Sequence, residues 1–458
     1  MPTKFISFLG TTRYEACSYF FENAHAEYYL TRFVQVSLIR RLVLDNRLGE
    51  GAEILVLATK AAKIQNWQDS KDRDDNHQTE LKTSLDNLKE ELTGKGFSFP
   101  PYRAEEIPEG KAKPELWTIF NQIAGLVEEG DHVYFDITHS FRSLPMLALV
   151  ALNYLRVVKK ITIEKIYYGA FETLGTLNEV KQMSLEQRHA PIFDLTPFVN
   201  LFEWTTAADH FIRTGNTFLL ADLTRRDSQP LIEAMPDSNI GKNYFTNLSD
   251  KLQSFMNSLL AARGTVISQS SYELKKAIGK ARQFVEALPP LSNLFDQIAM
   301  EFKDVNKPGE VIANTNIIIE YLLNHGLLQQ ALTLLDENII SFACLCCDFD
   351  YRHSKTRQVV TTALGIINMK VASDQWNLKN DGWMPKTRQK EIINIVTCKN
   401  LKSIAKLRSQ TKKLRDTINH AGFNNAKADY YDFLKEGRER LNQFITEIDA
   451  RKVAQIQL

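Results

Sequence analysis

A short polar segment near the end of the chain combines two side chains that suit phosphodiester chemistry. Within Leu414–Gly422, Arg415 lies five residues before His420. An imidazole can take or give a proton near neutral pH, and a guanidinium can stabilise negative charge on phosphate oxygens. At 100° per residue, Arg415 and His420 stand ~140° apart on an ideal helix, whereas Asp416 and His420 share a face. One helix therefore cannot easily aim Arg415 and His420 at one phosphate, but two helices that meet at a two-fold axis can.

The sequence before this segment is basic, although the whole chain is nearly neutral, with 56 Lys and Arg against 55 Asp and Glu. No acidic residue lies between Ile392 and Arg415, and the cations there are Lys399, Lys402, Lys406, Arg408, Lys412, Lys413 and Arg415. Such a basic stripe concentrates phosphodiesters near Arg415. The alternative is a solvated helix face whose acidic partners lie on a neighbouring helix.

The first 200 residues alternate β-branched or aromatic runs with amphipathic stretches, which is typical of repeated βα units. The predicted strands are 4–10, 52–59, 131–138 and 161–171, and the predicted helices lie near 31–48, 77–94, 114–128 and 142–158. We expect a Rossmann-like α/β sheet of parallel strands with helices on its faces.

From about residue 203 onward, apolar residues recur at three- and four-residue spacing, which predicts an all-α second half. Pro191 and Pro197 are expected to stop regular structure between the last sheet element and the first helix of that half. The predicted domains are therefore residues 1–200 and 201–458.

Polar loops follow three of the predicted strands, at the edge where open α/β sheets bind their ligands. These loops are Gly10-Thr11-Thr12-Arg13, Thr59-Lys60 and Asp136-Ile137-Thr138-His139-Ser140-Phe141-Arg142. The dinucleotide fingerprint G-x-G-x-x-G and the Walker motif G-x-x-x-x-G-K-[ST] are missing, so hydride transfer with NAD and ATP hydrolysis have no sequence support. An anionic phosphodiester suits these loops. The alternative for the last loop is that Asp136 and Thr138 cap the following helix while His139 satisfies a backbone carbonyl.

The composition also bears on cellular compartment and on metals. Five cysteines are too few and too clustered for a disulfide framework, which favours a reducing cytosol. No stretch approaches the ~18 apolar residues of a membrane span, so we expect a cytoplasmic protein without membrane contact. The run that holds Cys344, Cys346 and Cys347 predicts buried structural thiols, and no metal site is expected.

Four stretches in order resemble CRISPR-associated CARF domains. YFDITHSFRSLP is similar to the D-x-T-H motif of that family, with Ser140 where many members have glycine. FLGTTRY, TRFVQVSLIRRLV and DLTPFVNLFEW are also similar to it, so the resemblance spans roughly residues 1–205. It implies a domain that dimerises and binds a ring of cyclic oligoadenylate across the dimer axis. The implied half-site contains Gly10, Thr11, Thr12, Arg13, Thr59, Lys60, Thr138, His139, Ser140 and Arg142.

The segment around Arg415 resembles the R-x-x-x-x-H motif of HEPN ribonucleases in its residues, its position near the chain end and its helical surroundings. The resemblance implies a catalytic group of Arg415, Asp416, Asn419 and His420 at a homodimer axis. RNA carries its own nucleophile, so no metal or other cofactor is required, and the expected products are a 2′,3′-cyclic phosphate and a 5′-hydroxyl.

The two resemblances together predict a metal-independent endoribonuclease of type III CRISPR antiviral defence. Cyclic oligoadenylate, with tetra-adenylate favoured, is expected to activate it allosterically to cut single-stranded RNA, and the homodimer can form a higher oligomer. The alternative is a CARF sensor or regulator whose helical domain binds nucleic acid or protein without cutting. Degradation of the ring by the CARF half stays open, and the sequence predicts no RNA sequence preference.

Overall fold

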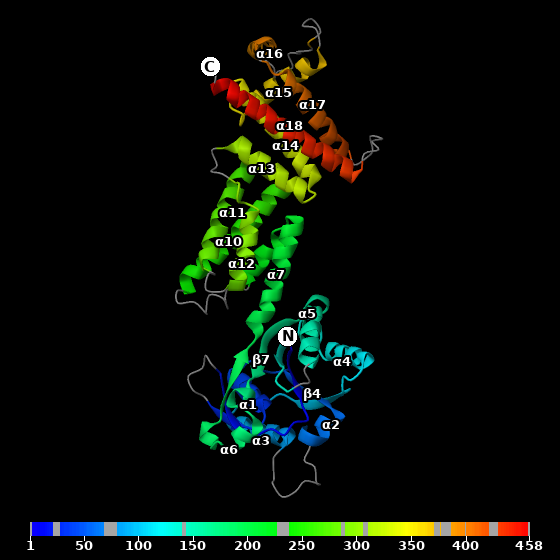
Figure 1. Ribbon diagram of the computed structural model, residues 1–458, viewed down its shortest axis with the longest axis vertical. Coiled ribbons are helices and arrows are strands. Elements are labelled where there is room, and N and C mark those ends of the chain that lie inside the picture. Colours follow the sequence, from blue (N-terminus) through cyan, green and yellow to red (C-terminus); the bar gives the residue numbers. More distant parts are fainter. Residues whose placement is uncertain are drawn as a thin grey trace. The chain divides into compact units, whose positions relative to one another are not determined.

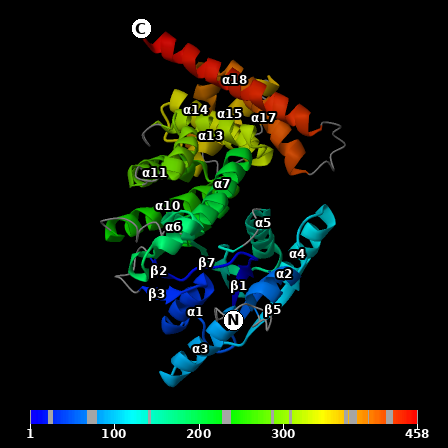
Figure 2. The same ribbon diagram turned by 60° about the horizontal axis from the view of Figure 1, so that its bottom comes forward.

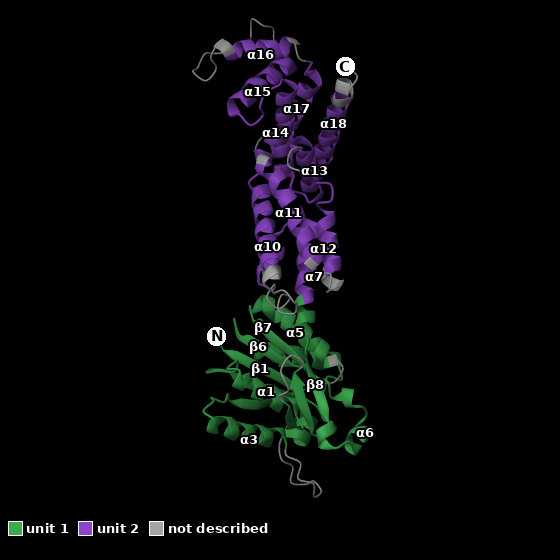
Figure 3. Ribbon diagram, turned by 90° about the vertical axis from the view of Figure 1, so that its left-hand side faces the viewer, with its two compact units in different colours: residues 1–200 green, residues 201–458 purple. Residues whose placement is uncertain are grey.

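The computed structural model describes residues 2–21, 28–67, 80–139, 143–226, 238–284, 289–305, 310–370, 376, 386–398, 400–420 and 429–456. The chain divides into two compact units, Met1–Asn200 and Leu201–Leu458 (Figure 3). The first unit is a mixed α/β sheet with helices and the second contains only helices among its described residues, so the predicted fold class is confirmed.

The described residues of the first unit contain eight strands in the spatial order β3-β2-β8-β7-β6-β1-β4-β5. Figure 1 shows the ribbon of the chain, with β4 and β7 labelled in this sheet. The strands are β1 (Thr3–Leu9), β2 (Cys17–Phe21), β3 (Tyr29–Thr31), β4 (Glu53–Thr59), β5 (Tyr102–Ile107), β6 (His132–Asp136), β7 (Thr162–Gly169) and β8 (His189–Asp194). The helices are α1 (Val34–Leu44), α2 (Lys60–Ala62), α3 (Leu81–Gly94), α4 (Lys113–Gly125), α5 (Ser143–Val158) and α6 (Leu177–Gln182). Short π and 3₁₀ turns cover Lys63–Trp67, Phe171–Leu174 and Leu185–Gln187.

The sheet is parallel at its centre and mixed at one edge. Strands β5, β4, β1, β6 and β7 are parallel neighbours, as expected from the βα pattern. Strand β8 runs antiparallel to β7, and β3 runs antiparallel to β2. The expectation of an all-parallel sheet is therefore wrong at this edge, because 3₁₀ turns and a short helix join β7 to β8 in place of a long crossover helix.

Buried side chains on both faces of the central strands make a three-layer unit. On β1, Phe5 and Leu9 belong to the core under α1 and α3, whereas Ile6 and Phe8 belong to the core under α4 and α5 (Figure 2). Successive side chains of a strand point to opposite faces, so the continuous apolar run of β1 serves both cores. Because β1, β4 and β6 are parallel, their carboxyl ends lie at the same end of the sheet, which is where the polar loops begin.

The two prolines predicted to stop regular structure lie inside regular elements. Pro191 is in β8, where its carbonyl accepts a hydrogen bond from the N–H of Ala170, at 2.9 Å. Pro197 is the second residue of α7 (Thr196–Thr214), which begins in the first unit and continues into the second. A helix tolerates proline in its first turn because the N–H that proline lacks has no partner within the helix. Only the single residue Leu195 separates β8 from α7.

The described helices of the second unit share one continuous apolar core. After α7 they are α8 (Phe218–Arg226), α10 (Ser238–Leu260), α11 (Gly264–Phe284), α12 (Pro289–Met300), α13 (Val311–Asn324), α14 (Leu328–Cys346), α15 (Ser354–Met369), α16 (Lys386–Cys398), α17 (Lys402–Asn419) and α18 (Tyr430–Ile456). Helix α14 is central to the later ones, because it contacts α13, α15, α17 and α18. None of the described helices is long and apolar enough to cross a membrane.

Candidate functional site

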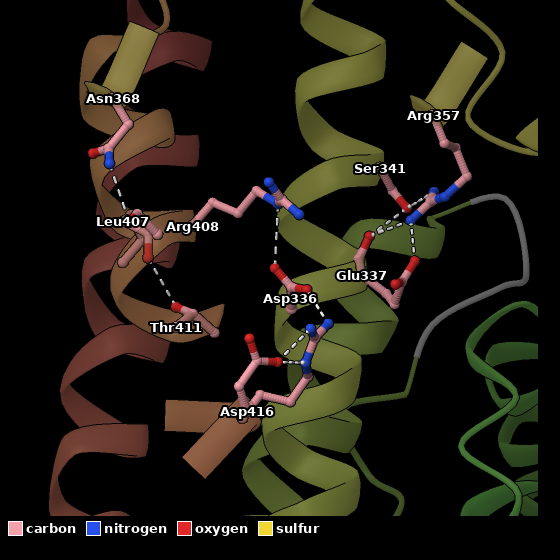
Figure 4. Close-up of polar contacts among 11 residues, drawn as sticks. Asp336, Glu337, Ser341, Arg357, Asn368, Leu407, Arg408, Thr411 and Asp416 are labelled. Carbon is pink, nitrogen blue, oxygen red and sulfur yellow. Dashed lines mark hydrogen bonds and ion pairs between the residues drawn. The ribbon is translucent and has the colours of Figure 1, made fainter. Parts of the chain in front are cut away.

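The centre of the helical site is a buried carboxylate. Asp336 lies on α14, and 1% of its side chain is exposed. A buried charge is costly unless it is paired. The partners of Asp336 are two arginines of the basic stripe, Arg408 and Arg415, which both lie on α17 (Figure 4).

Arg415 is bonded to two carboxylates. Its Nη1 donates to Asp336 Oδ2, and its Nε and Nη2 donate to Oδ1 of Asp416, at 3.1 and 2.6 Å. Asp416 therefore orients the guanidinium of its neighbour in the sequence. Burial lowers the pKa of Arg415, but the carboxylates of Asp416 and Asp336 outweigh burial, and the pKa lies above its ordinary value.

Arg408 is held by charge more than by hydrogen bonding. Its Nε lies 3.3 Å from Asp336 Oδ1, yet neither atom has an aligned hydrogen bond in the part of the chain that the structure describes. Burial raises the pKa of Asp336 above its ordinary value, and the charges of Arg408 and Arg415 oppose this effect. Arg415 lies seven positions after Arg408, which is almost two helical turns, so both side chains leave α17 on one face.

A second polar cluster joins α14 to α15. Arg357 donates through Nη1 to Ser341 Oγ at 2.7 Å and to the Tyr351 carbonyl at 3.0 Å, and through Nη2 to the Glu337 carboxylate. At the far end of α15, Asn368 donates to Ser409 Oγ of α17 at 3.1 Å. These contacts fix α14, α15 and α17 around a hollow of about 370 Å³.

The remaining residues of the predicted catalytic group lie at the end of α17. His420 is the C-cap, and its backbone N–H donates to the Asp416 carbonyl at 2.9 Å. Asn419 and His420 are exposed, and their side chains make no hydrogen bond to the described residues. The structure therefore brings Arg415 and Asp416 together within one chain but does not bring His420 to Arg415, in agreement with the helical geometry of the motif.

The basic stripe separates into two groups. Its arginines pair with Asp336, which matches the alternative of acidic partners on a neighbouring helix. Its lysines on α17 (Lys402, Lys406, Lys412 and Lys413) are exposed and form no ion pair in the described structure. Lys399 lies outside the described residues. Sequence analysis missed Asp336, which lies with Glu337 in the largely apolar segment 331–345.

At the sheet edge, Asp136 and Thr138 form a tight turn at the end of β6. Asp136 Oδ1 accepts from the N–H and the hydroxyl of Thr138, at 3.0 and 2.5 Å, and Oδ2 accepts from Ser7 Oγ at 2.7 Å. Thr138 Oγ1 in turn accepts from the N–H of Gly169 at 2.8 Å. These side chains bind the ends of β1, β6 and β7 together. Residues 140–142, which lead into α5, lie outside the described residues, so the alternative in which Asp136 and Thr138 cap that helix stays a prediction. Burial raises the pKa of Asp136 to about 6, and the hydrogen bonds from Thr138 and Ser7 oppose this effect.

The same turn occurs a second time at the end of β8. Asp194 Oδ1 accepts from the N–H and the hydroxyl of Thr196, at 2.9 and 2.5 Å, and Thr196 Oγ1 accepts from the N–H of Ile166 at 2.9 Å. The two D-x-T turns thus flank β7 and bind it from both sides. The Asp and Thr of the D-x-T-H motif therefore hold the backbone at the strand ends. The first turn differs from the second because a histidine, His139, follows it.

His139 is half-buried beside a cavity. Its ring centre lies 4.1 Å from that of Tyr14, and Nε2 is buried without a hydrogen-bond partner among the described residues. Burial lowers the pKa of His139 to about 3, so the ring is neutral near pH 7. A cavity of about 190 Å³ is lined by the predicted residues Thr12, Arg13, Thr138 and His139, and also by Arg32, Tyr168 and Phe171, which sequence analysis missed.

The loop after β1 is fixed by a buried amide. Asn66 Nδ2 donates to the carbonyls of Gly10 and Thr12, at 2.7 and 3.0 Å, and the N–H of Gly10 donates to Tyr14 Oη at 2.9 Å. A Cβ at Gly10 would lie 2.9 Å from Tyr14 Oη, which explains the glycine. Thr11, with Gly10, Thr59 and His139, lines a separate small cavity. Asn66 was not predicted, because an amide in a short π turn has no sequence signature.

The other predicted ligand residues have mixed outcomes. Thr59 is the N-cap of α2 and accepts from the N–H of Ala62 at 3.2 Å, whereas Lys60 is exposed. Ser140 and Arg142 lie outside the described residues. The structure therefore gathers residues from the loops after β1, β4 and β6 at one edge, as predicted.

Comparisons with known proteins match two ranges of the sequence, one within the sheet unit and one in the first part of the helical unit. Residues 4–172 match the CARF domain of the CRISPR system endoribonuclease Csx1, and residues 200–308 match the second domain of CRISPR-associated protein MJ1674. CRISPR-associated protein MJ1674 of Methanocaldococcus jannaschii is 31% identical to this chain over 152 residues, which are 32% of this chain and 22% of that protein. The chain thus matches about a fifth of the length of this curated relative. Both matched ranges end before α13, so Asp336 and Arg415 lie beyond them.

The CARF match covers β1 through β7 and the loops that follow β1, β4 and β6. It includes the D-x-T turn of β6, His139 and all the residues that line the cavity beside it except Leu177. The chain is therefore a CARF-containing protein related to CRISPR-associated proteins.

Proposed function

We propose that the chain is a metal-independent endoribonuclease that cyclic oligoadenylate activates to cut single-stranded RNA in the cytoplasm, in type III CRISPR defence. The observation that carries this proposal is the match of residues 4–172 to the CARF domain of an endoribonuclease family, in a chain whose helical unit holds Arg415 and His420. The sheet unit supplies the ring site, and α13–α18 supply the nuclease. Tetra-adenylate is the activator we favour.

The chemistry requires a proton carrier and a group that stabilises phosphate charge. The RNA 2′-oxygen attacks phosphorus and the bond from phosphorus to the 5′-oxygen breaks, which leaves a 2′,3′-cyclic phosphate and a 5′-hydroxyl. His420 takes the proton of the 2′-hydroxyl or gives one to the leaving 5′-oxygen. Arg415 stabilises charge on the non-bridging oxygens. The exposed lysines of α17 attract the RNA strand.

Two copies of the chain complete both sites in this proposal. An exposed apolar stripe on α5, formed by Met146, Val150, Tyr154 and Val157, supports pairing of two copies. Helix α5 begins at Ser143, directly after the loop that ends at Arg142, so a ring shared by two subunits brings both α5 helices to the axis. Val150→Glu should convert dimer to monomer in sedimentation velocity. Unchanged dimerisation would exclude α5 as the pairing surface.

The decisive experiment uses labelled single-stranded RNA in EDTA, with and without each cyclic oligoadenylate. We expect cleavage to rise strongly with one ring size and to need no divalent metal. Equal cleavage without ring and at saturating ring would contradict the sensor role. Loss of ring-stimulated cleavage in EDTA would contradict a metal-independent mechanism.

The rival function is a sensor that binds RNA or protein without cutting it. One contact favours this rival: Arg415 is bonded to the carboxylates of both Asp336 and Asp416, which leaves few donors for a substrate. The rival predicts that ring addition changes RNA or protein binding while labelled RNA stays intact.

A further inference from the structure

The hollow between α14, α15 and α17 is a polar feature that the motif does not include. Its volume is about 370 Å³. It is lined by Asp336, Glu337 and Ile340 of α14, by Arg357, Gln358, Thr361 and Thr362 of α15, and by Arg408 and Arg415 of α17. Three guanidiniums thus face two carboxylates, and α15 contributes no acidic side chain to the wall.

Arg408 is the cation in this hollow with the most donors available. Arg357 is engaged by Ser341 and Glu337, and Arg415 by Asp336 and Asp416. Arg408 contacts only Asp336 among the described residues, at 3.3 Å and without an aligned hydrogen bond. A guanidinium has five N–H donors, so Arg408 is positioned by charge while its donors stay unused.

Because the Arg408 side chain is mostly buried, its unused donors affect the free energy of the site. The Arg408 side chain is 12% exposed, and its Nε is buried without a partner in the described part of the chain. Unpaired buried donors cost free energy, and an oxygen-rich anion would remove that cost. A phosphodiester suits the site because its two non-bridging oxygens match the guanidinium fork of Arg408.

We propose that this hollow binds a backbone phosphate of the RNA strand outside the scissile position, with Arg408 as the contacting cation and Asp336 as its positioning residue. This inference rests on the proposed function, which makes RNA the ligand. The exposed lysines on α17 favour RNA over an acidic peptide, because they extend the positive surface along the same helix. Gln358 and the hydroxyl of Thr361 are neutral donors on the opposite wall.

The test measures binding of a fluorescent single-stranded RNA with 2′-O-methyl groups at every nucleotide, which removes the nucleophile. Anisotropy titrations of the full chain in EDTA with ring are run across salt concentrations. Affinity falls as salt rises, and for Arg408→Gln the slope of log affinity against log salt should be less steep by about 0.7. This corresponds to roughly a fivefold weaker affinity at 0.1 M salt. Arg408→Lys should restore the slope. The matched control is Arg213→Gln, which removes an exposed arginine of α7 paired with Asp209 and should change neither quantity.

A second pair of variants guards against a folding defect in Arg408→Gln. Thr361→Glu places a carboxylate in the hollow and keeps Arg408, so it should weaken RNA binding, whereas Thr361→Gln should not. Wild-type affinity and salt slope in Arg408→Gln, or equal binding by the two Thr361 variants, would overturn the inference. Cleavage of unmodified RNA is measured in parallel. If the wild-type chain binds RNA without cutting it, the ribonuclease proposal is wrong, and the variants above still test the phosphate site. If the wild-type chain does not bind RNA, both the ribonuclease proposal and the phosphate site are wrong.

Discussion

Asp136 of the sheet unit and Asp336 of the helical unit are both buried, but different groups stabilise them. Asp136 accepts hydrogen bonds from the neutral groups of Ser7 and Thr138, and burial raises its pKa to about 6. Asp336 lies between the guanidiniums of Arg408 and Arg415. In the sheet unit, neutral donors hold the backbone at a strand end. In the helical unit, two cations compensate the charge of a buried carboxylate. The first aspartate therefore organises a loop, and the second holds two arginines of α17 against α14.

The largest expected effect concerns the cations and the imidazole that the helical unit presents. His420→Ala and Arg415→Ala should each reduce ring-stimulated RNA cleavage in EDTA by ~10²- to 10⁴-fold, because each removes a group that acts on the reacting phosphate. Ring affinity, measured by calorimetry, should stay unchanged because the ring binds in the sheet unit.

His353→Ala is the matched control for this pair, since His353 is an exposed histidine of the same unit at the N-terminus of α15. It should cleave RNA at the wild-type rate. Near wild-type cleavage by His420→Ala would exclude the HEPN assignment and leave the basic stripe as a binding surface.

The next effect separates the two aspartates by stability. Asp336→Ala should lower the free energy of unfolding by about 3–5 kcal/mol, because it leaves two mostly buried guanidiniums without their shared partner. Asp136→Asn should not lower it at pH 7, since Asn can accept from Thr138 and donate to Ser7 Oγ. Urea unfolding of the full chain measures both variants. Equal losses in the two variants would remove the distinction between them.

A pH series sharpens the same comparison from the side of Asp136. Its folded pKa of about 6 lies above the unfolded value near 3.8, so the folded state binds a proton more tightly. The contribution of Asp136 to stability is therefore present below about pH 4 and is lost as the pH rises through 6. Relative to wild type, Asp136→Asn should gain about 2 kcal/mol of unfolding free energy between pH 4 and pH 7.

A difference between the two proteins that is constant from pH 4 to pH 7 would mean that Asp136 keeps its ordinary pKa. His139 shifts stability with the opposite sign, because burial lowers its pKa to about 3 and its contribution is lost as the pH falls below 6.5. It is common to both proteins, so it cancels from the comparison.

Local patterns in the sequence predicted most of the central sheet. Long apolar strands such as β1 and β4 are buried on both faces, and their composition alone indicates that position. The strands at the two edges, β2, β3, β8 and β5, were not predicted, because they lack a long apolar run and their pairing depends on tertiary contacts. The D-x-T sequence occurs at Asp136 and again at Asp194, and it forms the same turn in both places. Because the first copy follows a predicted strand, the second copy was a usable signal that a strand, β8, precedes it.

The candidate sites show the same limit. The motif that contains Arg415 and His420 is readable because its residues lie five apart in the sequence. Asp336 lies 79 residues before Arg415, so only the folded helices show that they meet. Asn66 similarly supports Gly10 from 56 residues away. Residues that position a site through long-range contacts leave no spacing pattern for sequence analysis to find.

The smallest expected effect tests an exposed charge at the sheet edge, where neutral groups dominate. Lys60 begins α2 at the carboxyl end of β4 and is exposed, so its attraction to a ring phosphate is screened by water. Lys60→Ala should weaken cyclic tetra-adenylate binding by no more than about fivefold, which corresponds to about 1 kcal/mol. Lys82→Ala is the control, because Lys82 is an exposed cation of the same unit paired with Asp86 on α3. Calorimetry at two salt concentrations measures both, and the Lys60 effect should shrink at high salt. Normal ring affinity together with lost RNA cleavage in Lys60→Ala would place this lysine outside the ring site.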